Sequence, residues 1–509
     1  MKVVFLYKEG LGLGVSYLSS YIKKYGHEVD LIYEHNTFAN MYINVPGLQK
    51  IEKALDDPMR TLQSKEFDII AFSVSTADYP WALDLAHKIK AYRNVPIIFG
   101  GYHPTLLPEL CIQKKEIDMI CLGEGEEAFS ELLDSMERGA IDYSIRNIWF
   151  KKDGTVIRNE LRPLKKNIDY LPFPDRELFF QYFPDFWKRE IGFVLASRGC
   201  PFGCSYCGNA AFNELYRGKG SILRLRSANN VLEECLFLRS EYNVKKIHFQ
   251  DDLFASNTAW LEDFIPKYKK QVKVPFTCLT HPRVMSARNI ELLKKGGCLL
   301  AIVGIQSGSE RVRREIFERN ETNQEIARFA ENCRKVKLNF SFNHIFDAPT
   351  DNEPEIFESA RFYNQVRPRI IDSYVLVYFP RARIIQTALE ANILKHDDVA
   401  AINEGRFEGV HQGGFYHIFG KYYQQYALLF VLIPALPRKL VSKILSTSWM
   451  LRMVKRLPLQ LMPFVKTYLN FLCGSSSFHY AAIRFNLYRT RKVLMGYWKI
   501  RKQMKAPVA

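Results

Sequence analysis

Three cysteines lie close together in the stretch RGCPFGCSYC, residues 198–207, with the spacing C-x3-C-x2-C. A structural zinc ion normally takes four ligands at short spacing. The next cysteine is Cys235 and the nearest histidine is His248, and both lie in or beyond an expected helix. A redox pair of Cys204 and Cys207 would leave Cys200 unexplained. In a 4Fe–4S cluster each iron takes one thiolate, so three cysteines would leave one iron open to another ligand.

The cysteines follow the first of six apolar segments that alternate with helical ones between residues 191 and 395. Such alternation predicts parallel strands joined by right-handed helical crossovers. Eight strands would close a complete barrel, so six predict an open, partial (βα)6 barrel. The expected strands cover residues 192–200, 245–252, 275–282, 299–310, 338–346 and 370–380.

Residues 1–135 form an earlier α/β series, and residues 136–190, rich in proline and charge, are the expected connector. The strands expected within residues 1–135 are almost wholly apolar, which predicts an open, doubly wound, Rossmann-like parallel sheet covered on both faces. Ligands of such sheets bind at the carboxyl ends of the strands. Each small or polar residue there fits an ordinary turn, but three groups at one edge favour a binding cleft. They are Ser73, Ser75 and Thr76, then Gly100, Gly101 and His103, then Gly123, Glu124 and Gly125.

The composition describes a large folded protein with an uneven charge. The 509 residues are 47% hydrophobic and 14% aromatic, which argues against global disorder. Ten scattered cysteines indicate a reducing compartment, and the first residues do not resemble a signal peptide, so we expect a cytoplasmic protein. Of the net charge of +17, residues 409–509 contribute 16 lysines and arginines and no acidic residue.

With an aromatic Tyr206 before its third cysteine, the C-x3-C-x-aromatic-C motif after a first barrel strand resembles the radical S-adenosylmethionine superfamily. The resemblance implies a 4Fe–4S cluster on Cys200, Cys204 and Cys207. Its open iron would bind S-adenosylmethionine, which is cleaved to methionine and a 5′-deoxyadenosyl radical.

Later strand ends carry further parts of this resemblance. It implies S-adenosylmethionine contacts from FQDDLF (249–254) and GIQSGSE (304–310), at Gln250, Asp251, Asp252, Gln306 and Ser307. Either aspartate is equally well explained as a helix cap. Many relatives have glutamate at the position of Gln306, and Asp347 and Ala348 depart from the fifth-strand pattern.

The N-terminal domain resembles the cobalamin-binding domain that precedes many such barrels. The resemblance rests on GLGLGVSYLSSYIKKYGHEV, FSVST, GGYHPT and GEGEEAFSELL, and it implies cobalamin contacts from the three strand-end groups. The expected Asp-x-His-x-x-Gly motif is missing, because the loop after the first strand reads YKEGLG. His103 is then the nearest strand-end histidine, although its turn more naturally shapes the loop.

The region 396–509 is expected to be helical and basic. Its apolar segments are interrupted by prolines and are shorter than the roughly 20 residues that span a bilayer. Apolar, aromatic and cationic residues without anions suit the inner face of an anionic membrane through residues 409–509. A helical cap on the barrel with a solvated basic face is an equal alternative, and nucleic acid is disfavoured because no binding module is visible.

The resemblance implies methyl transfer to an unactivated centre of a small-molecule or lipid substrate. A one-electron reductant such as flavodoxin or ferredoxin would be needed. The alternatives are a radical rearrangement or cyclisation by the same parts, and a non-catalytic cobalamin- or cluster-binding sensor.

Overall fold

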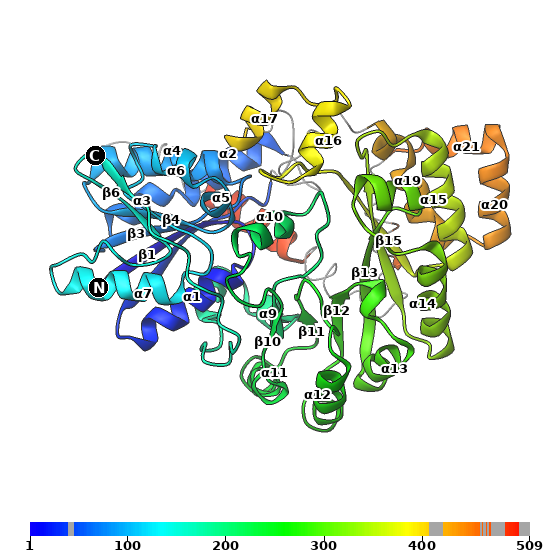
Figure 1. The fold of residues 1–509 in the computed structure, drawn as a ribbon, viewed down its shortest axis with the longest axis horizontal. Helices are drawn as coiled ribbons and strands as arrows, with labels where there is room; N and C mark the ends of the chain where they lie inside the picture. The colour runs from blue at the N-terminus through cyan, green and yellow to red at the C-terminus, as the bar shows by residue number, and fades with distance from the viewer. Residues whose placement is uncertain are drawn as a thin grey trace.

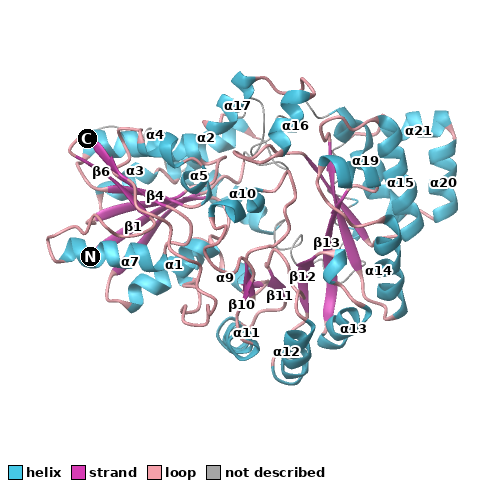
Figure 2. Ribbon diagram, viewed as in Figure 1, coloured by secondary structure: helices cyan, strands magenta, loops and turns pink. Residues whose placement is uncertain are grey.

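Two α/β units lie side by side in the computed structural model, the first blue to cyan and the second green to orange (Figure 1). The structure describes residues 1–38, 45–406, 421–458, 461, 465, 468–469 and 484–497. Helices α5 and α10 lie between the sheets of the two units (Figure 2). The predicted fold class, an open α/β domain followed by a partial barrel and C-terminal helices, is confirmed.

The first unit is built on a sheet with the strand order β2-β1-β3-β4-β5-β6-β7. Its first five strands are parallel, and the last two run antiparallel. Because β6 and β7 extend this sheet, the expected connector contributes to the first unit, which continues past residue 135. The strands are β1 (Lys2–Lys8), β2 (Glu28–Glu34), β3 (Ile69–Ser73), β4 (Ile97–Gly100), β5 (Met119–Cys121), β6 (Ile148–Lys152) and β7 (Thr155–Ile157).

Both faces of this sheet are covered, as its apolar strands predict. Alternate residues of β1 enter different cores, with Val3 and Phe5 on one face and Val4 and Leu6 on the other. This alternation follows from the two-residue period of a strand. The helices are α1 (Leu13–Lys24) and α7 (Glu126–Glu137) on the first face, with α2 (Pro46–Leu55), α3 (Pro58–Gln63), α4 (Tyr79–Tyr92), α5 (Tyr102–Leu106) and α6 (Pro108–Ile112) elsewhere in the unit.

The second unit contains the parallel sheet β15-β14-β13-β12-β11-β8, which is the expected partial barrel. The predicted strand at 192–200 is wrong in its second half, because the chain leaves the sheet after Val194 and forms an antiparallel ribbon of β9 (Ser197–Arg198) and β10 (Arg224–Leu225). The barrel strands are β8 (Gly192–Val194), β11 (Ile247–Phe249), β12 (Phe276–Thr280), β13 (Cys298–Gln306), β14 (Phe340–Phe346) and β15 (Ile370–Val375).

Side-chain caps begin the barrel helices where the sequence places Ser, Thr or Asn. Ser227 and Ser286 accept backbone hydrogen bonds at the starts of α11 and α13, and Thr322 and Asn352 form capping boxes with Glu325 and Glu355. The helices and short turns are α8 (Glu177–Phe180), α9 (Asp185–Lys188), α10 (Gly208–Leu215), α11 (Ala228–Tyr242), α12 (Thr258–Gln271), η1 (Pro282–Val284), α13 (Ala287–Gly296), η2 (Val312–Ile316), α14 (Asn323–Lys335) and α15 (Glu353–Val366).

The C-terminal region is helical, and its first long helix is part of the barrel core. Most apolar side chains of α19 are buried against the barrel, and those of Tyr426 and Phe430 are fully buried. Residues 484–497 are also helical, and Arg489 pairs with Glu52 of α2 at 2.7 Å. The remaining helices are α16 (Ile384–Glu390), α17 (His396–Asn403), α19 (Lys421–Ala435), α20 (Arg438–Ser446) and α21 (Ser448–Lys455).

Candidate functional site

The three clustered cysteines lie on the loop between the ribbon strand β9 and helix α10. Gly199 enters this loop with a φ of +84°, and a Cβ there would lie 2.2 Å from the carbonyl oxygen of Ile222, so only glycine fits. All three cysteines are free thiols; Cys204 is buried, and Cys200 and Cys207 are partly exposed. The loop therefore presents three thiols together, and none is used in a disulfide.

The spacing of the sulfur atoms bears on whether the three cysteines suit a single zinc ion or an iron–sulfur cluster. Sulfurs around one tetrahedral zinc ion lie roughly 3.8 Å apart, given a Zn–S bond of about 2.3 Å. Within the described part of the chain, these thiols do not form a group whose ligand atoms all lie within 4.8 Å of one another. At least one pair of these sulfurs therefore lies farther apart than a single tetrahedral zinc ion requires, whereas three thiolates are a donor set that fits a 4Fe–4S cluster.

The charges around the loop favour thiolates only when a metal is present. Burial raises the pKa of Cys200 and Cys207 to about 11. The buried Arg319 lies 3.6 Å from the Sγ of Cys204 and also donates to the Oη of Tyr206 at 3.1 Å. Because the pKa of two of the thiols stays raised with Arg319 beside the loop, holding them as thiolates needs further positive charge, which iron would supply.

The three predicted contacts at the end of β11, Gln250, Asp251 and Asp252, differ from one another in burial and in hydrogen bonding. Asp251 is buried and accepts hydrogen bonds from the Ala196 amide at 3.1 Å and the Ser197 hydroxyl at 2.5 Å. Burial raises the pKa of Asp251 to about 6. Asp252 is exposed and close enough to Cys200 and Cys207 to raise their pKa, and the side chain of Gln250 is also exposed. Asp251 therefore ties β11 to the ribbon, whereas Gln250 and Asp252 are open to a ligand.

The two predicted contacts at the end of β13, Gln306 and Ser307, also differ in exposure. Gln306 has a φ of +65°, a strained conformation for a side chain other than glycine, and it is partly exposed. Ser307 is buried, where its hydroxyl accepts from the Ser309 amide at 3.1 Å and lies 3.3 Å from the Ser359 hydroxyl. Gln306 therefore stands at the end of β13 with a partly exposed side chain, while the Ser307 hydroxyl stabilises the turn that follows.

Sequence reasoning missed the polar residues that pack around the cysteine loop. Arg319 joins Cys204 to β13 through the carbonyl of Gly304 and pairs with the buried Glu321 at 2.6 Å. The ring of His281, after β12, stacks on Phe202 of the loop at 4.2 Å. Burial, aided by Arg319, lowers the pKa of His281 to about 2, so its imidazole is neutral. No motif marks these positions, because their role comes from contacts between distant segments.

A cavity of about 450 Å³ lies at the carboxyl ends of β1, β3, β4 and β5. Gly101 has a φ of +92°, and a Cβ there would lie 2.8 Å from the Val74 amide nitrogen. The second unit contributes Leu195 and Arg198 to the lining. The cavity is lined by six of the predicted cobalamin contacts, namely Ser73, Gly100, Gly101, Gly123, Glu124 and Gly125. Small residues and apolar side chains at this edge fit part of a large, flat ligand such as a corrinoid.

The other three predicted contacts lie outside this lining. The hydroxyl of Ser75 donates to Asp78 at 2.6 Å. His103 is fully buried; its ring packs at a tilt against that of Tyr79, with the centroids 4.1 Å apart, and its Nδ1 lies 3.2 Å from the Thr76 hydroxyl. Burial lowers the pKa of His103 to about 4. These contacts support the interpretation that the histidine turn shapes the loop.

Helix α10 places the cysteine loop beside the cavity. Its Asn209 accepts a hydrogen bond from Tyr102, after β4, at 3.2 Å, and a Cβ on Gly208 would lie 2.6 Å from the Tyr102 ring. At its other end, Tyr216 approaches so closely that a Cβ on Gly123 would lie 1.7 Å from its Oη. Because α10 starts directly after Cys207, these contacts make the loop and the cavity neighbouring parts of one site.

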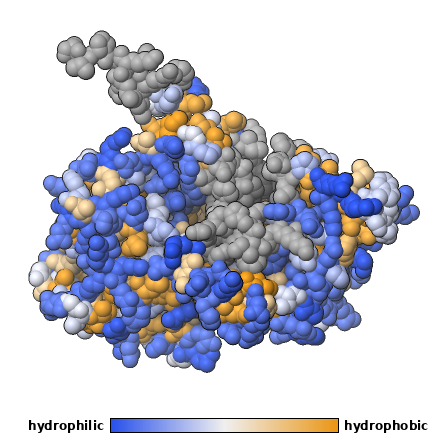
Figure 3. Space-filling view, turned by 90° about the horizontal axis from the view of Figure 1, so that it is seen from above, coloured by the Kyte–Doolittle hydropathy of each residue, from blue (hydrophilic) through white to orange (hydrophobic). Residues whose placement is uncertain are grey.

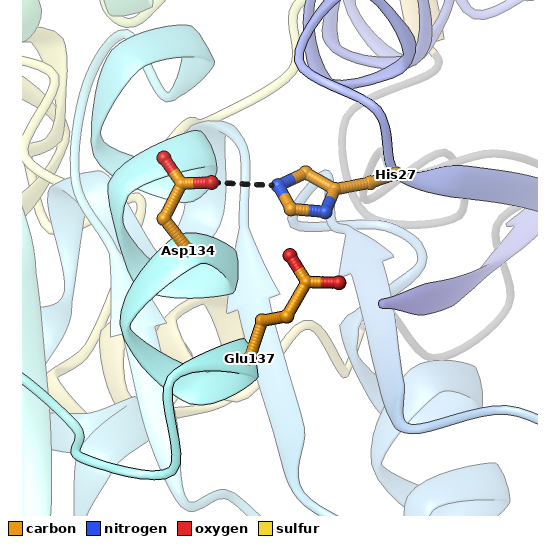
Figure 4. Close-up of side chains that lie close together, drawn as sticks. All are labelled: His27, Asp134 and Glu137. Atoms are coloured by element: carbon orange, nitrogen blue, oxygen red, sulfur yellow. Dashed lines mark ion pairs between the residues drawn. The ribbon is translucent and has the colours of Figure 1, made fainter.

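A separate polar group lies at the turn before β2, away from the carboxyl ends of the strands. Asp134 and Glu137 of α7 point toward the ring of His27, whose Nε2 lies 3.3 Å from an Asp134 oxygen (Figure 4). The amino group of Met1 lies 3.1 Å from Glu137. The His27 ring and the Met1 amino group thus supply nitrogen partners for these two carboxylates, and we assign this group no ligand.

Two family models match the chain: the B12 binding domain at residues 6–133 and the radical SAM superfamily at residues 194–363. An uncharacterized methyltransferase of Pyrococcus horikoshii is 28% identical over 76% of this chain and 80% of its own length. The cytidylyl-2-hydroxyethylphosphonate methyltransferase of Streptomyces wedmorensis is 26% identical over 60% of this chain, which spans only 63% of that relative.

Solved structures share the fold. OxsB, a cobalamin-dependent S-adenosylmethionine radical enzyme, matches with a TM-score of 0.63 and 14% identity over 99% of this chain and 81% of its own. The methyltransferase TsrM of Kitasatospora setae matches with a TM-score of 0.61 and 14% identity over 75% of this chain and 74% of its own. The cysteine loop, the cavity and both family models agree: the chain belongs to the radical S-adenosylmethionine enzymes that carry a cobalamin-binding domain.

Proposed function

We propose that this enzyme transfers a methyl group to an unactivated carbon or phosphorus centre of a small molecule. The observation that carries the proposal is the joining of the cysteine loop to the cavity through α10. A methyl carrier in the cavity and a radical source on the loop would then face a shared space. Methyltransferases among its relatives, one of which is named for a phosphonate substrate, support this reaction class.

Cys200, Cys204 and Cys207 would hold the cluster, and the glycine-lined cavity would hold part of the corrinoid. When bound, the cluster supplies an electron for cleavage of S-adenosylmethionine, and cobalamin supplies a methyl carrier. The exposed side chains of Gln250 and Asp252, together with Gln306, are suited to orient S-adenosylmethionine beside the open iron.

The protein contributes order and exclusion of water at this site. Tyr206 packs edge-on against Phe317 at 5.0 Å, and Phe202 stacks on the neutral His281, so ring contacts fix the loop at its middle and near its end. Arg319 holds the loop to β13 with a charge that burial shields from solvent. A fixed, shielded loop keeps a reactive radical close to its substrate.

Anaerobic reconstitution followed by product analysis tests the proposal. With a reductant such as flavodoxin or ferredoxin, the protein should convert S-adenosylmethionine to 5′-deoxyadenosine and bind corrinoid. Replacing Cys200, Cys204 and Cys207 together with Ala should abolish the cluster spectrum. The variant Cys235→Ala, a buried cysteine outside the loop, should keep it. Cluster absorption in the triple variant would contradict the proposal.

A radical cyclisation is the second candidate, because one relative is the anaerobic magnesium-protoporphyrin IX monomethyl ester cyclase of Synechocystis, 22% identical over 50% of this chain. A sensor is the third alternative. Isotope-labelled methyl groups distinguish all three: label in the product supports methyl transfer, turnover without label transfer supports cyclisation, and cofactor binding without cleavage supports a sensor.

We further propose that the enzyme is cytoplasmic and associates with an anionic membrane surface through α20 and α21. Hydrophobic residues interrupt the hydrophilic surface on the face seen in Figure 3. On and after α21, Trp449, Met453 and Leu457 are 57%, 61% and 40% exposed at a spacing of four residues. The cations nearby include Lys439, Lys443, Arg452 and Arg456. Such a stripe with cations beside it suits an anionic interface.

Among the described residues, no helix has the length and apolar character to cross a bilayer. Flotation with phosphatidylcholine vesicles, with and without phosphatidylglycerol, tests surface binding. The double variant Trp449→Glu and Met453→Glu should lose binding to the anionic vesicles. The variant Tyr92→Glu, which changes an equally exposed ring on α4, should retain it. Equal flotation of both variants would contradict surface binding through α21 and would favour the alternative that this region is a helical cap on the barrel.

A further inference from the structure

A group of charged side chains joins the edge of the cavity to the ribbon that precedes the cysteine loop. Glu124, after β5, accepts hydrogen bonds from both terminal nitrogens of Arg224, at 2.7 and 2.8 Å. Arg198 lies 3.2 Å from Glu124 and 2.6 Å from Glu126. The guanidinium of Arg198 also lies over the ring of Tyr17, 5.0 Å from its centroid. We call the group Glu124, Arg198 and Arg224 the clasp.

The ribbon gives the clasp a fixed geometry. Arg198 and Arg224 are direct partners in the antiparallel pair β9–β10, so both guanidinium groups reach the same carboxylate from neighbouring positions. The Arg224 side chain is only 2% exposed, and that of Arg198 is 17% exposed. A bidentate ion pair in such surroundings is geometrically specific and is screened less than a surface pair.

Both oxygens of Glu124 already have donors. Oε1 accepts from Arg198 and Arg224, and Oε2 accepts from Arg224. Burial would raise the pKa of Glu124, but Arg224 and Arg198 hold it below its ordinary value, so the carboxylate stays charged. A carboxylate with these partners is better suited to joining two segments than to binding a cofactor.

The clasp connects the two halves of the site over a short length of chain. Glu124 lies between Gly123 and Gly125, which line the cavity, and Arg198 is separated from Cys200 by one residue. That residue is Gly199, which cannot carry a side chain without a clash. A movement of the cavity edge would therefore be passed directly to the first cysteine.

We propose that the clasp sets the distance between a corrinoid in the cavity and the cluster on the cysteine loop. Glu124 is then a positioning residue and not a cofactor contact, in contrast to the role that the family resemblance implies. The inference rests on the proposed function, because it needs both groups to be bound.

Magnetic interaction between the two centres tests the clasp directly. Under dithionite, the reduced cluster and cob(II)alamin each carry an unpaired electron, and their dipolar interaction falls with the cube of the distance. The enzyme loaded with both should show a split or broadened cob(II)alamin signal in electron paramagnetic resonance. In Glu124→Gln, this splitting should diminish or spread, while the spectrum of each centre alone stays unchanged.

Matched variants separate positioning from general damage. Arg224→Gln removes the cationic partner of the same ion pair and should change the splitting as Glu124→Gln does. Glu124→Asp keeps the charge with a shorter reach and should give an intermediate shift. Glu109→Gln removes a bidentate pair with Arg158 on the surface of the first unit and should leave the splitting unchanged.

Several results would overturn the proposal. Unchanged splitting in both Glu124→Gln and Arg224→Gln would show that the clasp does not set the distance. Loss of corrinoid binding in Glu124→Gln with normal binding in Arg224→Gln would make Glu124 a cofactor contact. An absence of corrinoid or cluster in the unaltered protein would instead contradict the proposed function itself.

Discussion

The ion pairs of Glu234 should contribute strongly to the stability of the barrel. Glu234 of α11 is fully buried and binds two arginines, Arg176 from the connector and Arg226 after β10, whose side chains are each 5% exposed. The change Glu234→Ala removes the only carboxylate between these two guanidinium groups among the described residues. Their charges would then remain buried without an anion.

The surroundings of the two arginines set the expected size of the effect. Breaking a buried ion pair by removing one partner costs about 3–5 kcal/mol. Arg176 would keep its hydrogen bond to the Phe193 carbonyl at 2.7 Å, and Arg226 would keep those to the Leu195 carbonyl at 2.9 Å and to Asn230 at 2.6 Å. Because these neutral acceptors remain, we expect a value near the lower end, about 3 kcal/mol.

Thermal unfolding of the cluster-free protein measures this cost. A loss of about 3 kcal/mol corresponds to a fall in Tm of roughly 6–12 °C for a domain of this size. The variant Glu233→Ala changes the exposed neighbour on the same helix and should shift Tm little. If Glu234→Ala lowered Tm no more than Glu233→Ala, the argument from buried charge would be refuted.

Three further predictions concern the site. Gly123→Ala should weaken corrinoid binding, because its Cβ would overlap Tyr216. Adding Tyr216→Ala should restore part of the lost affinity in binding titrations. Equal affinities of the single and double variants would show that the clash with Tyr216 is not the cause. The folded-state pKa of Asp251, about 6, lies above the unfolded value of 3.8, so stability should fall as pH rises between these values, by about 3 kcal/mol. Urea unfolding at several pH values should show that Asp251→Asn removes this slope, and an equal slope in the variant would exclude Asp251 as its cause. Arg319→Gln removes a cation beside Cys204 and should lower the cluster's midpoint potential, on the order of tens of millivolts, in redox titrations; an unchanged potential would count against this charge effect.

The parts of the fold that were predictable depend on local patterns. The spacing of Cys200, Cys204 and Cys207 and the apolar strands are readable from neighbouring residues, as are small residues such as Gly101 that follow the strands. Capping residues such as Thr322 also have a purely local signal. These features need no knowledge of which distant segments meet.

The features that sequence reasoning missed depend on contacts between distant segments. Glu124 looks like a ligand contact in its glycine-flanked turn, yet its partners are 74 and 100 residues away. Arg319 carries no motif and reaches the cysteine loop from 115 residues along the chain. The apolar residues of α19 have the same pattern whether they face lipid or a barrel, and their burial is decided by the β15 edge that they cover.

The position of α10 has a consequence for protein engineering. The helix starts directly after Cys207, and the first unit contacts it at both ends, with Tyr102 at Gly208 and Gly123 at Tyr216. The first unit therefore cannot be exchanged for that of a relative simply by cutting the chain at the connector. A chimaera that joins a new cavity domain to this barrel must bring a matching tyrosine and glycine with it. Without them, the graft would alter the cysteine loop even though every cysteine is retained.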